Sequence, residues 1–264
     1  MSEGKRHLLE VHDIHTFYGN IEALKGISLT VEEGYDYVSL RGIAEHLHGG
    51  EAASADIARL AHFYFSTDSP HRVVAFTVDA AYKTADTYLD LPVVAFDEVA
   101  ARYPPSAYGM FVALSYTGMN QLRASKYGEA RALGYVLVSY VSSRCSCLTQ
   151  HPIGDNCFIL EDNTVQPFVR LGSNVTLWSG KHIGHDTVVG DHCFISSHVV
   201  VSGHVAIGTH CFLGVNATIR NGVTIGDHTL VGAGALIMKS TPPRSVYVAA
   251  RTDRFAKSSD QVEL

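Results

Sequence analysis

The chain has 264 residues, of which 46% are hydrophobic and 17% are charged, a composition typical of a folded globular protein. Its formal net charge of -6 offers no basic surface for nucleic acid, and it contains neither a signal peptide nor an apolar run of about eighteen residues. We therefore expect a soluble, cytoplasmic protein that binds neither nucleic acid nor a membrane. Five cysteines are an odd number, and we expect them to be reduced.

The N-terminal stretch at residues 8–34 reads LLEVHDIHTFYGNIEALKGISLTVEEG. It resembles the opening of the ATP-binding subunits of branched-chain amino-acid ABC transporters. In that family a phosphate loop of the G-x-x-x-x-G-K-[ST] type follows within about a dozen residues, but residues 35–50 contain none and none occurs later. Without that loop the chain has no site for ATP hydrolysis. We interpret residues 1–34 as an appended, hairpin-like extension.

Residues 35–150 have the pattern of a small Rossmann-like α/β domain. An amphipathic helix is indicated at residues 56–63. Apolar, strand-like runs follow at residues 73–78, 93–96 and 110–114, with helical patterns between them. Apolar strands that alternate with helices are typical of a parallel, doubly wound sheet. Asp79 ends the first of these runs, where such folds often contact a ribose.

A period of six governs residues 151–241. An aliphatic residue stands at every sixth position, namely Ile153, Ile159, Val165, Leu171, Leu177, Ile183, Val189, Ile195, Val201, Ile207, Leu213, Ile219, Ile225, Val231 and Ile237. Neither an α-helix nor an ordinary strand repeats on six, whereas a triangular coil of three short faces places every sixth side chain on its axis. Glycine often follows the aliphatic residue, where a corner would fall. We predict a parallel β-helix of hexapeptide repeats with about five coils, followed by a polar tail at residues 242–264.

The repeats, together with the α/β segment before them, resemble the NeuD-like group of sugar O- and N-acyltransferases. The motifs that carry this resemblance are Ile183-Gly184-His185-Asp186, Gly190-Asp191, Ser202-Gly203 and Cys211-Phe212-Leu213-Gly214-Val215-Asn216. That family folds as trimers of left-handed β-helices, with acetyl-CoA in a groove between neighbouring subunits. The resemblance therefore implies a left-handed coil, a homotrimer and acetyl-CoA as co-substrate. The period of six does not by itself fix the hand.

The resemblance also assigns catalytic roles. The family's general base matches His185, and the acid that follows, here Asp186, orients it or tunes its basicity. An acetyl thioester is already activated, so catalysis mainly requires removal of a proton from the attacking amine or hydroxyl, and imidazole titrates near neutral pH. One coil after His185 comes Gly203, whose N–H is expected to polarise the thioester carbonyl. Further CoA contacts are expected at Val215, at Ala233, where a small side chain permits close approach, and at Lys239, which is placed to meet a phosphate.

The acceptor site is less regular. Family members begin with a strand that leads into a glycine-rich turn, which helps to hold the nucleotide portion of the acceptor. The corresponding residues 48–55 read HGGEAASA and lack a G-x-G-x-x-G signature. Either residues 38–40 replace the missing strand and Gly49 and Gly50 bend toward the ligand, or the phosphate cradle is lost. In the first case we expect Gly49, Gly50 and Asp79 to contact a sugar or nucleotide-sugar acceptor.

Two other functions compete with an acetyltransferase. The coil could be a trimeric, non-catalytic scaffold for the α/β domain. Related coils, the γ-type carbonic anhydrases, hold zinc with three histidines, two of them spaced H-x-x-x-x-H. No two histidines in residues 151–264 are five apart, so we predict no metal site. The other coil histidines, His192, His198, His204, His210 and His228, each come three places after an inward residue and are interpreted as solvated corner residues or neighbours of a subunit interface. The prediction is an acetyl-CoA-dependent transferase that acts on the amine or hydroxyl of a sugar, either a nucleotide-linked amino sugar or a sugar of the sialic acid type.

Overall fold

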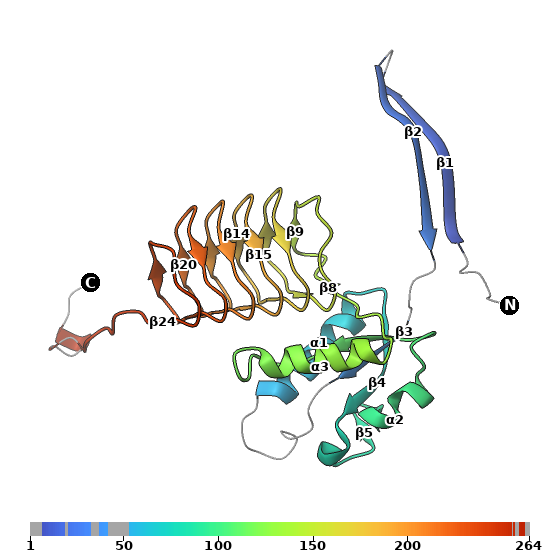
Figure 1. Cartoon of the computed structure of the whole chain (residues 1–264), viewed down its shortest axis with the longest axis horizontal. Helices are drawn as coiled ribbons and strands as arrows, with labels where there is room; N and C mark the ends of the chain where they lie inside the picture. Colours follow the sequence, from blue (N-terminus) through green and yellow to red (C-terminus); the bar gives the residue numbers. More distant parts are fainter. Residues whose placement is uncertain are drawn as a thin grey trace. The chain divides into compact units, whose positions relative to one another are not determined.

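The computed structural model divides the chain into two units, residues 1–36 and 37–264 (Figure 1). It describes residues 7–18, 21–32, 37–41, 53–254, 256 and 259–261. In the first unit, strands β1 (His7–Tyr18) and β2 (Ile21–Glu32) form an antiparallel ladder. This pairing agrees with a hairpin-like extension within residues 1–34, but the extension and the expected domain boundaries at residues 34, 150 and 241 stay predictions.

The second unit begins with a mostly parallel sheet that has the order β5-β6-β4-β3-β7 among the described residues. Its strands are β3 (Tyr37–Arg41), β4 (Arg72–Val78), β5 (Thr87–Tyr88), β6 (Leu91–Ala95) and β7 (Gly109–Val112). β3 pairs in parallel with both β4 and β7, so residues 38–40 supply the central strand that the first sequence alternative required. Gly49 and Gly50, the other half of that alternative, lie outside the described residues.

Helices cover both faces of this sheet. They are α1 (Ala53–Thr67), α2 (Phe96–Arg102) and α3 (Gln121–Ala132), with a 3-10 turn η2 (Ala80–Tyr82) after β4. Side chains of β7 alternate between the two faces, because successive residues of a strand point in opposite directions. Phe111 packs in one buried cluster with Phe65 of α1. Met110 packs in another with Val99 of α2 and Tyr127 of α3. The predicted Rossmann-like α/β arrangement is confirmed.

The rest of the unit is a coil of short parallel strands in three sheets (Figure 1). Sheet one contains β8 (Tyr140–Val141), β10 (Phe158–Ile159), β13 (Thr176–Leu177), β16 (Phe194–Ile195), β19 (Phe212–Leu213), β22 (Leu230–Val231) and β24 (Val246–Tyr247). Sheet two contains β9 (Ser146–Cys147), β11 (Thr164–Val165), β14 (His182–Ile183), β17 (Val200–Val201), β20 (Thr218–Ile219) and β23 (Leu236–Ile237). Sheet three contains β12 (Arg170–Leu171), β15 (Val188–Val189), β18 (Ala206–Ile207) and β21 (Thr224–Ile225). The tail includes a short 3-10 turn, η3 (Ser259–Gln261).

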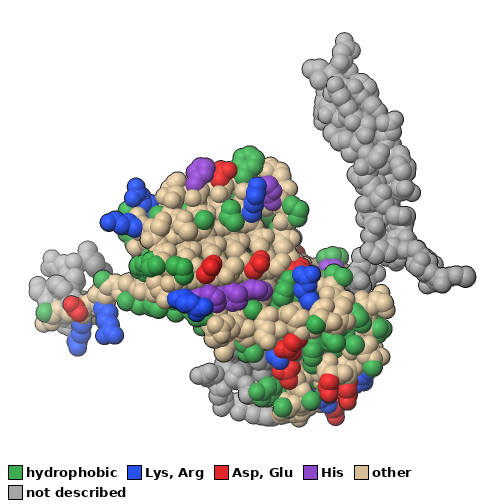
Figure 2. Space-filling view, viewed as in Figure 1, with side chains coloured by type: hydrophobic (Ala, Val, Ile, Leu, Met, Phe, Trp, Pro, Cys, Tyr) green, Lys and Arg blue, Asp and Glu red, His purple; other side chains and the backbone are tan. Residues whose placement is uncertain are grey.

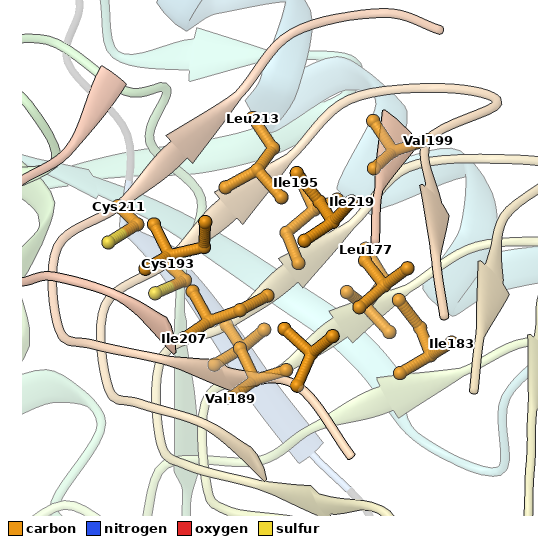
Figure 3. Close-up of a cluster of buried hydrophobic side chains, with 14 of the residues drawn as sticks. Leu177, Ile183, Val189, Cys193, Ile195, Val199, Ile207, Cys211, Leu213 and Ile219 are labelled. Carbon is orange, nitrogen blue, oxygen red and sulfur yellow. The ribbon is translucent and has the colours of Figure 1, made fainter. Parts of the chain in front are cut away.

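The interior of the coil is the stack of aliphatic side chains that the period of six predicts. All of the fifteen register positions are buried except Ile153, which is partly buried. Figure 3 shows Leu177, Ile183, Val189, Ile195 and their neighbours turned toward one another inside the prism. Strand pairs such as Ile183↔Val201 join residues eighteen apart, one full coil. The five cysteines all lie among the described residues, where Cys157, Cys193 and Cys211 are buried free thiols and Cys145 and Cys147 partly buried ones.

The outer face of sheet one is covered by the α/β domain. Tyr140 and Phe158 belong to the same buried cluster as helix α1. Arg123 of α3 is 1% exposed and donates to the carbonyl oxygens of His192 (3.2 Å) and Cys193 (3.1 Å). The coil is thus anchored to α3 along one side. Among the described helices, none has the length and apolar character that a bilayer crossing requires.

Each coil turns at three corners, and equivalent corners stack into three edges. The edge between sheets two and three, called the His185 edge, contains residues 184–186 and 202–204. The edge between sheets three and one, called the His192 edge, contains residues 190–192, 208–210 and 226–228. The edge between sheets one and two, called the Trp178 edge, contains residues 178–180, 196–198 and 214–216. The third residue of many corners has a positive φ, as at Asp186 (56°), His192 (62°) and His204 (55°). Asn, Asp and His tolerate this conformation better than most residues, which explains why histidine recurs there.

Candidate active site

His185 stands at an open corner and is held from two sides. Its backbone N–H donates to Oε1 of Gln166 at 2.8 Å. Its ring Nδ1 lies 2.9 Å from Oδ2 of Asp186, and the two side chains are 50% and 42% exposed. When Nδ1 donates its hydrogen to this carboxylate, Nε2 keeps its lone pair free to accept a proton. The pair therefore has the form of an oriented general base.

Gly203 lies directly beside the Nε2 side of this imidazole, opposite the nitrogen that contacts Asp186. A Cβ built on Gly203 would come within 2.7 Å of His185 Nε2, so only glycine leaves the ring in place. Among the described residues, the N–H of Gly203 has no hydrogen-bond acceptor. A backbone donor next to a proton acceptor is the arrangement needed where a carbonyl gains negative charge during attack.

His204 is a second imidazole at this corner. It follows Asp186 by one coil, and its backbone N–H donates to the carbonyl oxygen of His185 at 2.9 Å. Its ring packs edge-on against the ring of His185, with centroids 4.9 Å apart. Its Nε2 lies 4.0 Å from Oδ2 of Asp186. The carboxylate is thus shared between two partly exposed imidazoles.

A cavity of about 420 Å³ opens at the Trp178 edge, between the coil and the α/β domain. Aromatic rings form much of its wall, with centroid distances of 5.0 Å between Tyr116 and Phe194 and 5.8 Å between Trp178 and Phe194. The other lining residues are Ile57, Arg59 and Leu60 of α1, together with Ser115, Ser196, Ser197 and Val215. Flat apolar walls with a few hydroxyl groups suit a ring-containing ligand.

A second row of histidines occupies the His192 edge, next to α3, and Figure 2 shows it as a line of purple side chains along the coil. The rings of His192 and His210 have centroids 4.7 Å apart, and those of His210 and His228 are 4.5 Å apart. Asn174 continues the row with its Nδ2 2.9 Å from Nδ1 of His192. Burial, followed by the neighbouring His210, lowers the pKa of His192 to about 4. Burial, and after it the neighbouring His228, also lowers the pKa of His210. His192 and His210 are therefore partly buried packing groups and not fully solvated corner residues.

The predicted site residues fall into three groups. His185, Asp186 and Gly203 meet at one corner, and Lys239 lies exposed on the same edge, two coils beyond Gly203 by the register of β17, β20 and β23. Val215 and Ala233 stack at the Trp178 edge, so one chain alone does not bring them to His185. Asp79 follows β4 and forms an ion pair with Lys126 at 2.6 Å. Gly49 and Gly50 lie outside the described residues.

Several residues of these sites are not predicted from the sequence. His204 follows Asp186 by eighteen residues, so an offset of one coil would have found it. Gln166 precedes His185 by nineteen residues on the neighbouring coil, so the same offset, which leads to Pro167, would have missed it. The aromatic cavity had no such signal, because α1 and the coil are distant in sequence and no periodic rule joins them.

Two family models match the coil. Residues 169–203 match the bacterial transferase hexapeptide model (six repeats), and residues 204–239 match the hexapeptide repeat of succinyl-transferase. The coil is a hexapeptide-repeat domain. No curated protein matches the chain.

Solved structures share the fold of the hexapeptide coil and of the α/β domain before it. The acetyltransferase domain of PglB from Neisseria gonorrhoeae, solved with acetyl coenzyme A, has a TM-score of 0.66 at 22% identity and covers 81% of this chain and 96% of its own. PerB from Caulobacter crescentus, solved with CoA and GDP-perosamine, has a TM-score of 0.65 at 24% identity, with coverages of 81% and 94%. WeeI from Acinetobacter baumannii has a TM-score of 0.64 at 18% identity, with coverages of 80% and 95%. The predicted fold, an α/β domain followed by a left-handed β-helix, is confirmed.

Proposed function

We propose that the chain is an acetyl-CoA-dependent acetyltransferase that acts on the amine or hydroxyl of a sugar, with a nucleotide-linked amino sugar as the preferred acceptor. The observation that carries this proposal is the geometry of His185, whose Nδ1 pairs with Asp186 while its Nε2 faces the backbone of Gly203. An oriented base beside an unused N–H is what acyl transfer from a thioester requires.

In the proposed mechanism, Nε2 of His185 accepts the proton of the acceptor amine or hydroxyl as that atom attacks the thioester carbonyl carbon. Asp186 stabilises the imidazolium that forms, and the N–H of Gly203 donates to the negatively charged carbonyl oxygen. The carbon–sulfur bond then breaks, and the leaving CoA thiolate takes the proton from the imidazolium. The base returns to its starting state, and no acyl group is attached to the protein.

The choice of donor and acceptor is supported by the solved relatives and by the aromatic cavity. PglB was solved with acetyl coenzyme A, and PerB with CoA and GDP-perosamine. In this chain the rings of Tyr116, Trp178 and Phe194 provide flat walls that suit a nucleobase or a sugar ring. Gly49, Gly50 and Asp79 stay proposed acceptor contacts.

The proposal includes a homotrimer, because the proposed contacts lie on different edges of one prism. His185 and Gly203 belong to one edge, whereas Val215 and Ala233 belong to another. A groove formed by two copies side by side would unite both sets around one CoA molecule, with Lys239 near its phosphates. Exposed small and apolar side chains on sheets two and three, such as Val188 and Val200, support contact between copies.

The test compares His185→Asn with His228→Asn, a change to a partly exposed histidine of the His192 edge. With acetyl-CoA and nucleotide amino sugars as substrates, loss of the base is expected to lower turnover by roughly 100-fold or more, while His228→Asn keeps wild-type turnover. CoA should raise the melting temperature of all three proteins, since it binds the native state. Equal turnover in wild type and His185→Asn would remove His185 from the mechanism. A wild type that CoA does not stabilise would favour the scaffold function.

A further inference from the structure

Three side chains that commonly bind transition metals converge at the His185 edge. Each of His185, Asp186 and His204 offers one ligand atom, and these atoms all lie within 4.8 Å of one another. We propose that this corner binds a divalent transition-metal ion such as Zn²⁺ through His185 Nδ1, the Asp186 carboxylate and His204 Nε2, and that the bound ion switches off the base.

The separations fit a tetrahedral ion. Ligand atoms about 2.0–2.2 Å from zinc stand roughly 3.3 Å from one another in a tetrahedron. Here Nδ1 of His185 is 2.9 Å from the Asp186 oxygen, and Nε2 of His204 is 4.0 Å from it. Small side-chain rotations therefore bring the three atoms to the required spacing, without a change in the backbone.

The chemistry and the accessibility of the corner also suit such an ion. Two imidazoles and one carboxylate form a ligand set that zinc and its neighbours in the first transition row accept. The three side chains are between 42% and 59% exposed, so an ion reaches them from solvent and water can fill a fourth position. The hydrogen bond from the N–H of His204 to the carbonyl oxygen of His185 holds the two coils in register beneath the ligands.

This site escaped the spacing rule applied to the sequence because that rule compares histidines within one stretch of chain. Here Asp186 and His204 come from successive coils and are eighteen residues apart, so they are neighbours only after the coil has formed. In a stacked repeat, ligand spacing has to be counted in whole coils.

Inhibition of acetyl transfer by the bound ion rests on the proposed function, whereas the ion site itself does not. A neutral imidazole carries one hydrogen on its two nitrogens. If the ion takes the lone pair of His185 Nδ1, the hydrogen must reside on Nε2, which then has no lone pair for the acceptor's proton. The ion also occupies Asp186. Transfer therefore stops although the thioester groove stays open.

The first experiment measures ion binding by isothermal titration of untagged, full-length protein with Zn²⁺. Wild type is expected to bind one ion per chain at this corner, and His204→Gln to weaken that binding at least about tenfold. His228→Asn is the matched control, since His228 is also a corner histidine with a positive φ, and it is partly exposed. Because Cys145 and Cys147 are partly exposed thiols, the titration is repeated with C145S/C147S, which should keep the site. Equal affinity in wild type and His204→Gln would overturn the proposal.

The second experiment measures acetyl transfer against Zn²⁺ concentration, each variant being normalised to its own rate in EDTA. Zinc should reversibly inhibit acetyl transfer by wild type and by His228→Asn. Half-inhibition of His204→Gln should need a zinc concentration at least about tenfold higher. Zinc binding at the corner without inhibition would overturn the switch. Protein that binds zinc but transfers no acetyl group in EDTA would refute the proposed function and leave the ion site standing. Protein that is active in EDTA but binds no zinc would refute the site alone.

Discussion

The His185 edge and the His192 edge of the coil carry imidazoles at corners of the same repeat, yet their environments are opposite. At the first, His185 and His204 share the carboxylate of Asp186 and are about half exposed. At the second, His192 and His210 stack in a row beneath α3, and burial lowers the pKa of both. One edge leaves its imidazoles open to solvent beside a carboxylate, and the other packs them against α3.

The difference comes from what covers each edge and not from residue type. α3 supplies the ring of Tyr127, whose centroid is 5.4 Å from that of His192, and the guanidinium of Arg123. Both exclude water and disfavour a positive imidazole. The His185 edge has no such cover among residues 53–254, and it has a carboxylate instead. Histidine count is therefore a poor guide to function in this coil, and the neighbours of each ring decide its role.

The variant with the largest expected effect disrupts the packing of α3 over the His192 edge. Arg123 donates to the side chains of Asn120 and Thr176 and to the carbonyl oxygens of His192 and Cys193. Arg123→Met removes all of these hydrogen bonds, although the carbonyl oxygen of Cys193 still accepts from the N–H of Thr176, and should lower the free energy of unfolding by about 3 kcal/mol or more. Urea denaturation monitored by circular dichroism measures the loss.

Arg131→Met is the matched control for that change. It alters the same helix, but the Arg131 side chain is 58% exposed, and its ion pair with Asp155 is screened by solvent and should contribute little to stability. Similar losses in the two variants would show that the buried arginine does not anchor α3 to the coil.

A second test uses pH. The pKa of His192 is about 4 in the folded chain and near 6.5 when unfolded, so between these values the unfolded state binds more protons. Stability should therefore fall as pH decreases from about 6.5 to about 4, by about 2 kcal/mol after allowance for the ring's partial exposure. His192 faces Asn174, His210, Tyr127, Arg123, Asp191 and Asp155.

His192→Asn should flatten that slope, since asparagine tolerates the positive φ, continues the row begun by Asn174 and does not titrate. His210 contributes a smaller slope of the same sign, because burial and the nearby His228 lower its pKa as well. Denaturation midpoints at several pH values measure the slope. An unchanged slope in His192→Asn would mean that the covered row does not control acid sensitivity.

The test with the smallest expected effect concerns the His185 edge. Gly203→Ala places a methyl group against Nε2 of His185, and the ring has room to rotate away. Turnover should fall about tenfold, near 1.4 kcal/mol, with little loss of stability. Gly222→Ala on the same edge has open space around the new methyl group but a φ of 72°, so it should lose stability and keep its turnover. If the two variants lose turnover equally, the absence of a side chain at Gly203 does not determine the position of the His185 ring.

The sequence predicted the periodic parts of this molecule well. The interior positions from Ile159 to Ile237 are buried as the period of six requires, because in a stacked coil each residue's direction is set by its place in the hexad. Strands β4, β6 and β7 were predicted as apolar runs, and the central strand β3 was one of two alternatives, whereas β5 was not predicted. Contacts between distant segments were not predictable, such as Arg123 with the carbonyl oxygen of His192, since no local pattern encodes them.

At the candidate site, too, the residues related by a motif or by the repeat were predicted, and others were not. His185, Asp186 and Gly203 were found through a motif and a one-coil offset, and the structure brings them together. Their catalytic roles stay predictions. His204 was overlooked because corner histidines were treated as one class, although its offset from Asp186 is the same as that of Gly203 from His185.

The pairing of Ile183 with Val201 has a consequence for how such a chain can change its length. An insertion of one hexad between His185 and Gly203 would advance every downstream residue by a third of a turn, and the glycine would leave the edge on which the imidazole stands. Insertion or loss of a whole coil elsewhere in the stack rotates nothing. Indels in this part of the gene are therefore tolerated in multiples of eighteen codons, and any other multiple of six keeps a hydrophobic axis while it dismantles the corner where His185 lies.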